Sequence, residues 1–512
     1  MKNKLSSLLS TGALALYALL FGGITLAITF KNVIFTYRLS LQFILLGALA
    51  VGLAVFLLVY KRINPVLIRH RYKLLAVFCI FMFAVQLAVS LNMVPNVMYD
   101  HDKTLNAAIV WTLEGNSERF QLYNNYLHHY PHQMGIFLLQ QTIFKLAAAV
   151  GITNFFLVAC VVGHLLFMVM NVTAFKYLDE NISSHSAIFY LLLSAIYIPM
   201  YFQSSVSYTD TWSAWAAPCL LLFGTRAFKA ESNGKTVLYS LLTGLLAGTV
   251  MQIKMTGVFV LLAMAIMLFV KGINKKQMCA LALVLCAIMV TNTAFHHWNY
   301  ATVLEEYRDG ESMPKTHWIM MGLQGDGSYS GYDEWEITCA VPPEDRVARN
   351  IEVIKERLAE MGAGGYLKLL YTKTCRTFGS GNADLRYSFK YEEDYNPQTL
   401  LYHFVFENGS LYTVNNNLSQ AVYLMMNILG VAGAVIVLVK KHKIKDFSPY
   451  LALAGFWLFM MLWESNHRQL INQWSLFFIV AAIGLYNITD VLFHFKTGKT
   501  DKTETVTTDS RI

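Results

Sequence analysis

Residues 39–60 are LSLQFILLGALAVGLAVFLLVY, an apolar stretch without a charged side chain. A helix of roughly 20 such residues crosses a bilayer core, so this stretch is long enough to span a membrane. The rest of the chain has the same character. Of its 512 residues, 55% are hydrophobic and only 14% are charged, whereas an ordinary soluble domain has roughly 25% charged residues. So little charge cannot cover a globular surface in water, and most of the chain is expected to face lipid.

Similar apolar runs recur along the sequence, and they predict an all-α polytopic membrane protein with about twelve transmembrane helices. The expected spans are 8–30, 39–60, 74–96, 153–175, 185–203, 210–228, 236–252, 256–272, 278–296, 419–440, 448–463 and 470–493. The first of them is too long for the core of a signal peptide, and we interpret it as an anchor.

Segment 131–150, PHQMGIFLLQQTIFKLAAAV, decides the topology. It is apolar, but two glutamines and a lysine interrupt it. If it does not cross, the basic clusters all fall in cytoplasmic loops, as the positive-inside rule requires; if it crosses, most of them face outward. These clusters lie at 61–73, 226–235, 271–276 and 440–445. We therefore expect an interfacial or re-entrant helix at 131–150, and both termini in the cytoplasm.

This topology divides the chain into five parts. They are 1–73 with two N-terminal spans, 74–300 with a transmembrane module and its external loop 97–152, the extracytoplasmic loop domain 301–418, the C-terminal spans 419–495, and the disordered cytoplasmic tail 496–512. The net charge is +8, but region 301–418 holds 18 acidic and 11 basic residues. The positive excess thus belongs to the cytoplasmic loops, and nucleic-acid binding has no support.

The polar region 301–418 allows two structural predictions. Apolar residues at helical spacing between 347 and 361 predict an amphipathic helix, which Gly362 ends, and residues 366–378 predict a second helix. Five of the seven cysteines lie in apolar runs, where a small hydrophobic residue is the expected role. Cys339 and Cys375 lie in the polar region, where an extracytoplasmic disulfide could join them.

Acidic side chains at the ends of spans are the first candidates for chemistry, because a carboxylate is costly in hydrocarbon. Asp100, His101 and Asp102 follow the third span, and they could supply a general base or ligands for a divalent cation. Asp210 lies at the external end of the fifth span. The alternatives are a solvated loop for the first group and a helix cap for Asp210. The topology puts both groups on the same face of the membrane.

Cations suited to a phosphate lie on the same face. Lys254 lies at a break between two short spans. The alternative is an interfacial lysine whose side chain extends to water and has no binding role. Arg468 could clamp a phosphate and Glu464 could position it, unless 464–469 is a plain surface turn. In the large loop, aromatic residues near His317 and Trp318, together with Tyr332 and Trp335, could stack on sugars or anchor the chain at the interface.

The order of these features resembles the GT-C glycosyltransferases, the multispan enzymes that use polyprenyl-phosphate-linked sugars, such as the protein O-mannosyltransferases and the aminoarabinose transferase of lipid A. The resemblance covers residues 74–300. It rests on Asp102 with its spacing to Ala107 and Gly115, on the helix start Tyr130-Pro131-His132-Gln133, and on Lys254-Met255-Thr256-Gly257. It implies a GT-C-like fold, Asp102 as the catalytic carboxylate, and a role for Tyr130, His132 and Gln133 in substrate binding.

The chemistry of sugar transfer fits these residues as well. Transfer from a lipid phosphate to a hydroxyl group needs a base and a stabilised phosphate leaving group. Our prediction assigns Asp102 as the base and Lys254 as the cation. Asp100 and Asp210 orient the acceptor or hold a metal, and His101 assists either task. A divalent cation is the one cofactor considered. One carboxylate base predicts inversion. The acceptor would be a cell-envelope glycan, wall polymer, lipid or protein.

Two other functions remain open at this stage. A transporter or flippase of lipid-linked glycans would show internal repeats and ionisable residues within its spans, and the sequence shows neither. A catalytically silent relative would bind partners through the large loop. Loss of transfer on replacement of the base would separate an enzyme from both.

Overall fold

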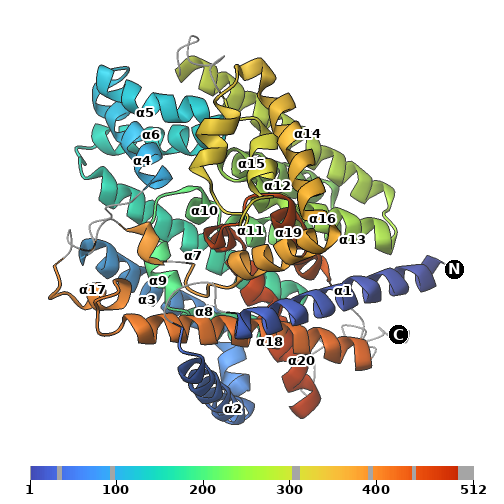
Figure 1. Cartoon of the computed structure of the whole chain (residues 1–512). Helices are drawn as coiled ribbons and strands as arrows, with labels where there is room; N and C mark the ends of the chain where they lie inside the picture. Colours follow the sequence, from blue (N-terminus) through green and yellow to red (C-terminus); the bar gives the residue numbers. More distant parts are fainter. Residues whose placement is uncertain are drawn as a thin grey trace, which may run out of the picture.

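The structure, a computed structural model, describes residues 2–31, 37–92, 99–302, 312–383, 385–389, 392, 396–440 and 446–493 (Figure 1). Every regular element in this part of the chain is helical. The order is α1 (Lys2–Phe30), α2 (Leu39–Arg69), α3 (Arg71–Asn92), α4 (Asp100–Glu114), α5 (Glu118–His129), η1 (Pro131–Gln133), α6 (Met134–Ala149), α7 (Phe155–Asn181), α8 (Ser184–Ala195), α9 (Pro199–Gln203), α10 (Thr209–Trp212), α11 (Ala216–Lys229), α12 (Asn233–Ile253), η2 (Met255–Val258), α13 (Phe259–Lys271), α14 (Lys275–Thr302), α15 (Lys315–Met321), η4 (Asp333–Thr338), η5 (Pro343–Asp345), α16 (Arg346–Phe378), η6 (Leu385–Ser388), α17 (Leu400–Val405), α18 (Tyr412–Lys440), α19 (Ser448–Leu462), η8 (His467–Gln473) and α20 (Trp474–Phe493).

Within the described residues, eight helices are long and apolar enough to cross a membrane, and three shorter apolar helices accompany them. The prediction of an all-helical multispan protein is therefore confirmed. Two expected spans differ in detail. Span 185–203 consists of α8 and the short α9, which begins at Pro199; proline lacks the amide N–H that a continuing helix needs. Span 210–228 consists of the single turn α10 and the helix α11.

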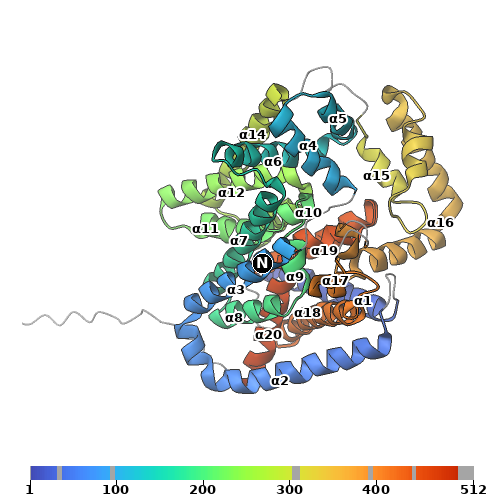
Figure 2. The same ribbon diagram turned by 90° about the vertical axis from the view of Figure 1, so that its left-hand side faces the viewer.

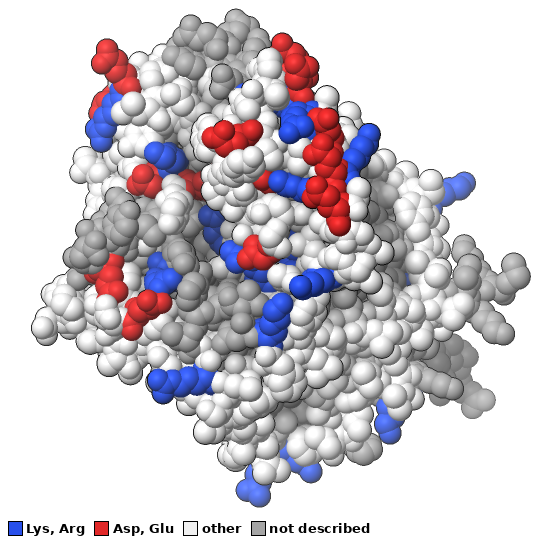
Figure 3. Space-filling view, in the orientation of Figure 1, with Lys and Arg blue, Asp and Glu red and all other residues white. Residues whose placement is uncertain are grey.

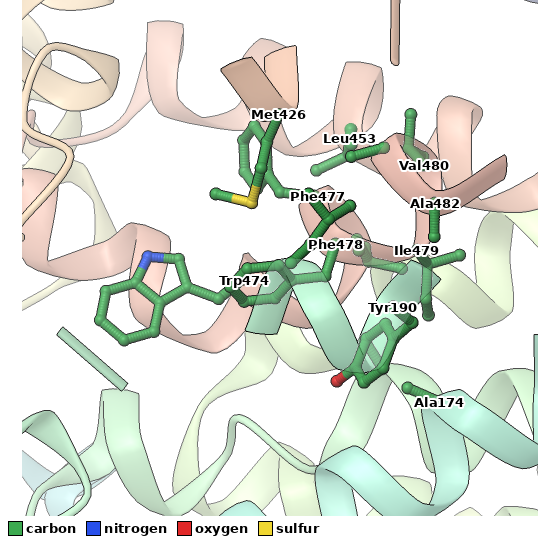
Figure 4. Packing of buried hydrophobic residues seen from close by; sticks show 14 of the residues in the cluster. Ala174, Tyr190, Met426, Leu453, Trp474, Phe477, Phe478, Ile479, Val480 and Ala482 are labelled. Carbon is green, nitrogen blue, oxygen red and sulfur yellow. The ribbon is translucent and has the colours of Figure 1, made fainter. Parts of the chain in front are cut away.

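Helix α20 lies at the centre of the bundle. Of the apolar window in His467–Phe493, 72% is buried, against 11% for α2, which therefore exposes nearly all its apolar surface to lipid. Figure 4 shows Trp474, Phe477 and Phe478 of α20 packed beside residues of α8, α18 and α19. Figure 2 shows α2 along one edge of the molecule, beside α18. Close packing around α20 fixes the helices that carry the polar ends of the spans.

The basic loops gather at one end of the bundle. Arg71 contacts Asp179 at 2.9 Å, Arg226 pairs with Glu180, and Lys229 donates to Asn181 at 2.9 Å. These contacts join the turns after α2, α7 and α11. Helix α3 starts at Arg71 and leads to Asp100 past its other end. The acidic candidates thus lie at the opposite end of this span from the basic cluster, as the predicted topology requires.

The opposite end carries the helices that do not span. Helices α15 and α16 form its outer layer, and acidic side chains gather over α16 on this face (Figures 2 and 3). Helix α16 bends at Gly362, whose left-handed backbone (φ 56°) interrupts it, so the two predicted helices at 347–361 and 366–378 are confirmed. Neither Cys339 nor Cys375 forms a disulfide. The suggested disulfide is therefore absent.

Segment 131–150 forms η1 and α6, and it lies outside the eight long apolar helices of the described chain. It packs against α12 so closely that a Cβ at Gly135 would stand 2.0 Å from the carbonyl oxygen of Gln252. Gln140 and Gln141 are buried, and Gln140 donates to Ser207 at 3.0 Å. The two glutamines that interrupt this run therefore face protein, whereas Lys145 is exposed. The tail 496–512 lies outside the described residues.

Candidate active site

Asp210 lies at the centre of a charged cluster at the end of the bundle away from the basic loops. Its side chain is 2% exposed, and it stands between two cations: Lys254 Nζ is 2.7 Å from Oδ1 and Arg468 Nε is 3.2 Å from Oδ2. A carboxylate buried this deeply is stable as an ion only with such partners. The structure therefore brings together three of the predicted residues from distant parts of the chain.

The segment that carries Asp210 is held by buried polar groups. His164 of α7 contacts Ser90 at 2.8 Å and Ser204 at 3.0 Å through its two ring nitrogens. The backbone of the same segment passes so close to α7 that a Cβ at Gly163 would stand 2.1 Å from the carbonyl oxygen of Ser204. These contacts fix the loop before α10, and hence the position of Asp210.

The two cations come from segments that are tied to each other. Lys254 has extended backbone (φ −155°, ψ 110°) between α12 and η2, so the predicted break is present. Asn472 of η8 donates to Thr256 Oγ1 at 2.6 Å, and Gln473 donates to the carbonyl of Thr256 at 3.2 Å. Because η8 also carries Arg468, the spacing between Lys254 and Arg468 is fixed by neutral hydrogen bonds.

Arg468 connects Asp210 to the first acidic motif. Its side-chain nitrogens lie 3.0 Å from His101 Nε2 and 3.5 Å from Asp100 Oδ2, and its guanidinium carbon lies 4.7 Å from the ring centre of Tyr208. Burial holds the pKa of His101 well below its usual range, and the positive charge of Arg468 lowers it further. His101 is therefore neutral and accepts a hydrogen bond from Arg468.

The structure places Asp100, and not Asp102, in this cluster. Asp102 points elsewhere and accepts a hydrogen bond from Asn106 at 2.7 Å. The chain turns at Tyr99, whose positive φ of 55° is rare for a bulky residue, and Asp100 then begins α4. The Asp100 side chain is 41% exposed, in contrast to Asp210. The first turn of α4 thus directs Asp100 toward Arg468, while the assignment of Asp102 as the base stays a prediction.

Glu464 lies beside the cluster, in the turn between α19 and η8. Burial raises the pKa of its carboxyl to about 7, with Arg468 opposing and Asp100 adding to the effect. Lys373 of α16 is completely buried beneath this turn. It donates to the carbonyls of Gly322, Met461 and Trp463 at 2.9, 2.9 and 2.7 Å. The outer helix α16 therefore holds the turn in place.

The predicted helix start at Tyr130 reaches the same cluster from the other side. Gln133 donates to the Tyr208 hydroxyl at 2.6 Å, and the Tyr208 hydroxyl lies 3.4 Å from Asp100. Tyr130 donates to Glu334. Burial lowers the pKa of His132 to about 4, and the positive charge of Lys254 contributes to this. His132 is thus neutral and lies near the cations.

A cavity of about 160 Å³ adjoins this segment between α6, α12 and α14. Its polar lining includes His132, Gln252, Asn292 and Asn299, and its apolar lining includes Leu138 and Phe295. A cavity of about this size has room for a group as large as a benzene ring.

His317 and Trp318 lie farther from the charges. His317 contacts Thr338 at 2.8 Å within the outer layer. Trp318 stacks on Trp463, with ring centres 5.4 Å apart, next to Glu464. The sequence drew no attention to Tyr208, Glu334 or Lys373, because an isolated tyrosine, glutamate or lysine carries no motif.

The three acids do not converge on one point in this structure, and the expected divalent cation stays a prediction. Oxygen-rich sites of Ca²⁺ or Mg²⁺ need several converging oxygen ligands, whereas Asp210 faces two cations and Asp102 points away. No group of three or more histidine, cysteine, aspartate or glutamate side chains converges in this way among the described residues.

The family model described as "Conserved hypothetical integral membrane protein" matches residues 11–488. The chain belongs to this family. No curated protein sequence matches it. The family is thus shown over nearly the whole chain, including every residue of the charged cluster.

Solved structures of two membrane glycosyltransferases resemble the fold. The oligosaccharyltransferase AglB from Archaeoglobus fulgidus, in complex with an inhibitory peptide and a dolichol-phosphate, has 12% identity and a TM-score of 0.42; the match covers 83% of this chain and 51% of AglB. ArnT from Cupriavidus metallidurans, bound to undecaprenyl phosphate, has 13% identity and a TM-score of 0.35, covering 82% of this chain and 77% of ArnT. The chain thus spans about half the length of AglB. Because identity and TM-score are low, we take the function from the site's own geometry.

Proposed function

We propose that this protein is a membrane glycosyltransferase, which transfers a sugar from a polyprenyl-phosphate carrier to a hydroxyl group of an acceptor on the extracytoplasmic face. One observation carries the proposal: Lys254 and Arg468 converge on Asp210, and Arg468 also reaches the more exposed Asp100. Two fixed cations beside an accessible carboxylate are what phosphate departure and hydroxyl activation require.

The carrier phosphate would bind to Lys254 and Arg468. In the present arrangement Asp210 satisfies both cations, so an arriving phosphate competes with it for them. Arginine suits this role because its planar fork matches a phosphate. Neutral His132 and His101 would donate or accept hydrogen bonds there without adding charge.

The acceptor hydroxyl would be activated by Asp100, whose side chain is accessible while Asp210 is buried. Asp100 takes the hydroxyl proton as the acceptor oxygen bonds to the anomeric carbon. The bond from that carbon to the phosphate oxygen breaks, and its electrons leave with the phosphate, whose charge the two cations stabilise. A single displacement of this kind inverts the anomeric centre, because a retaining route would need a nucleophilic carboxylate against the sugar. The acceptor would be a glycan, wall polymer, lipid or protein of the cell envelope.

A transporter or flippase would use the same cluster differently. Ionisable residues of transporters lie near the bilayer midplane between repeated halves, whereas Asp100 follows the end of α3 and Asp210 lies in the break between α9 and α11. The placement at one end of the spans favours an enzyme acting at one surface.

The test is sugar transfer by the purified chain in lipid nanodiscs, with polyprenyl-phosphate sugars and a cell-envelope extract as acceptor. Asp100→Asn should abolish transfer, because the amide cannot take the proton. Asp102→Asn is the matched control two residues away and should retain most of the rate. Equal loss in both variants, or full activity of Asp100→Asn, would refute the assignment of the base. No transfer by the wild type with any donor would refute the proposed function.

A further inference from the structure

Three large aromatic side chains lie exposed on the outer layer, close to the charged cluster. Tyr329, Tyr332 and Trp335 are 57%, 67% and 57% exposed; Trp335 belongs to the π-helical turn η4, Tyr332 directly precedes it, and Tyr329 lies four residues before it. We call these three residues the aromatic ledge. Aromatic residues so near in sequence and so exposed are unusual on a surface that faces water, and they indicate a binding surface.

The ledge is built on buried, fixed groups. Glu334, which is 3% exposed, accepts hydrogen bonds from the hydroxyls of Tyr329 at 2.7 Å and of Tyr130. The neighbouring Asp333 is bound by both terminal nitrogens of Arg357 at 2.7 Å. Tyr329 and the turn that carries Trp335 are therefore held in place, which reduces the conformational entropy lost when a ligand binds.

A continuous series of rings leads from the ledge to the charged cluster. Trp335 stacks on His129 at 5.4 Å between ring centres, and His129 contacts Tyr130, also at 5.4 Å. Tyr130 lies 6.4 Å from Trp318, which stacks on Trp463. Trp463 directly precedes Glu464. A series of ring contacts thus joins the aromatic ledge to the turn that carries Glu464.

The charge around the ledge restricts the ligand. Residues 312–345 contain six acidic side chains and one basic one. Asp326 and Asp333 are paired with Arg376 and Arg357, while Glu336, Glu344 and Asp345 are exposed. Such a surface repels polyanions and anionic lipid headgroups. A neutral or cationic ligand with flat apolar faces and many hydroxyl groups is the one that fits.

We infer that the aromatic ledge binds the acceptor, and that this acceptor is a carbohydrate without net negative charge. The inference rests on the proposed function, since it names the acceptor of the same site. A pyranose ring has an apolar face that stacks on an aromatic ring, and its hydroxyls remain free for solvent and for the carboxylates nearby. The ledge would hold one part of a glycan while another part follows the series of rings toward Asp100.

The experiment measures binding without any donor, so it does not depend on transfer. The full chain in nanodiscs is titrated with neutral oligosaccharides of glucose, mannose, galactose and N-acetylglucosamine, and with anionic oligosaccharides of galacturonic acid and sialic acid. Saturation-transfer NMR and tryptophan fluorescence report binding. At least one neutral series should bind and the anionic series should not. Trp335→Ala and Tyr332→Ala should each weaken binding about two- to tenfold, the size of one aromatic stacking contact.

Tyr371→Ala is the matched control. Tyr371 is an exposed aromatic residue on α16, 46% exposed, outside the ledge. It should leave binding unchanged. Absence of binding by every neutral series, equal effects of Trp335→Ala and Tyr371→Ala, or stronger binding of the anionic series would overturn the inference. Strong quenching of Trp335 fluorescence by brominated lipids in the nanodisc would also overturn it, because the ledge would then lie in the membrane. Transfer with another acceptor class would persist in these cases, so the proposed function would survive.

Discussion

Arg468→Lys tests the site while it keeps the positive charge. The guanidinium of Arg468 uses a different nitrogen for each of three partners: Nε for Asp210 at 3.2 Å, one terminal nitrogen for His101 at 3.0 Å and the other for Asp100 at 3.5 Å. Lysine has one nitrogen at one point, so it cannot occupy the three positions from which the guanidinium nitrogens reach Asp210, His101 and Asp100.

The size of the effect follows from the contacts that are lost. A hydrogen bond to a charged group contributes about 1.5–3 kcal/mol. The contact to Asp100 is long, and the Arg468 side chain is 23% exposed, so solvent screening reduces the total. We expect a loss of about 2–3 kcal/mol in transition-state stabilisation, which lowers kcat/KM about 30- to 150-fold.

The assay is transfer by the purified variant in nanodiscs, with protein folding checked by size exclusion and thermal unfolding. Arg349→Lys is the control, because Arg349 makes an exposed ion pair with Glu352 on the outer face of α16, and it should be neutral. If Arg468→Lys retains more than about a third of the wild-type kcat/KM, the reasoning from the three-way contact is refuted.

Four further predictions concern pH and stability. Burial raises the pKa of Glu464 to about 7, so this carboxyl is mainly charged only above that pH. The charged carboxylate then competes with the carrier phosphate for the cations. KM for the donor should therefore rise above pH 7 in the wild type and stay level in Glu464→Gln. The same shift means that the folded state binds the proton more tightly, so the wild type should lose stability as pH rises from about 4.5 to 7, and an unchanged unfolding temperature would contradict this. Lys373→Met removes three buried hydrogen bonds and should lower the free energy of unfolding by at least about 3 kcal/mol, measured by denaturant unfolding in micelles. Lys368→Met, at an exposed position, is the control and should leave it unchanged. Equal stability of the two variants would contradict this prediction. Gly135→Ala places a Cβ 2.0 Å from a backbone carbonyl of α12 and should lower the yield of folded protein, whereas Gly234→Ala, with open space around it, should not.

Most of the fold follows from the sequence because lipid imposes a simple rule on it. A run of about 20 apolar residues is stable mainly as a membrane-spanning helix. The basic residues of the loops then predict the orientation of each helix in the membrane. The interrupted segment 131–150 lies outside the eight long apolar helices of the described chain, in line with its interpretation as a helix that does not cross. The breaks at Pro199 and before α11 were missed, because the residues around them are apolar enough to read as one span.

The site could be predicted only in part. Asp210, Lys254 and Arg468 stood out because charges at the ends of spans are rare. The choice between Asp100 and Asp102 could not be made from sequence, since it depends on the backbone turn at Tyr99 and on which side of α4 faces Arg468. Contacts such as Tyr130 with Glu334 join residues 204 positions apart, and no local pattern announces them.

The most direct test of the central claim is the binding of undecaprenyl phosphate to the chain in nanodiscs, followed by native mass spectrometry. The wild type should bind one molecule. Lys254→Met should weaken binding about tenfold or more, the contribution of one charge-assisted contact, and Asp210→Asn should strengthen it because the competing carboxylate is gone. Binding that is the same in all three proteins would contradict a phosphate held between Lys254 and Arg468.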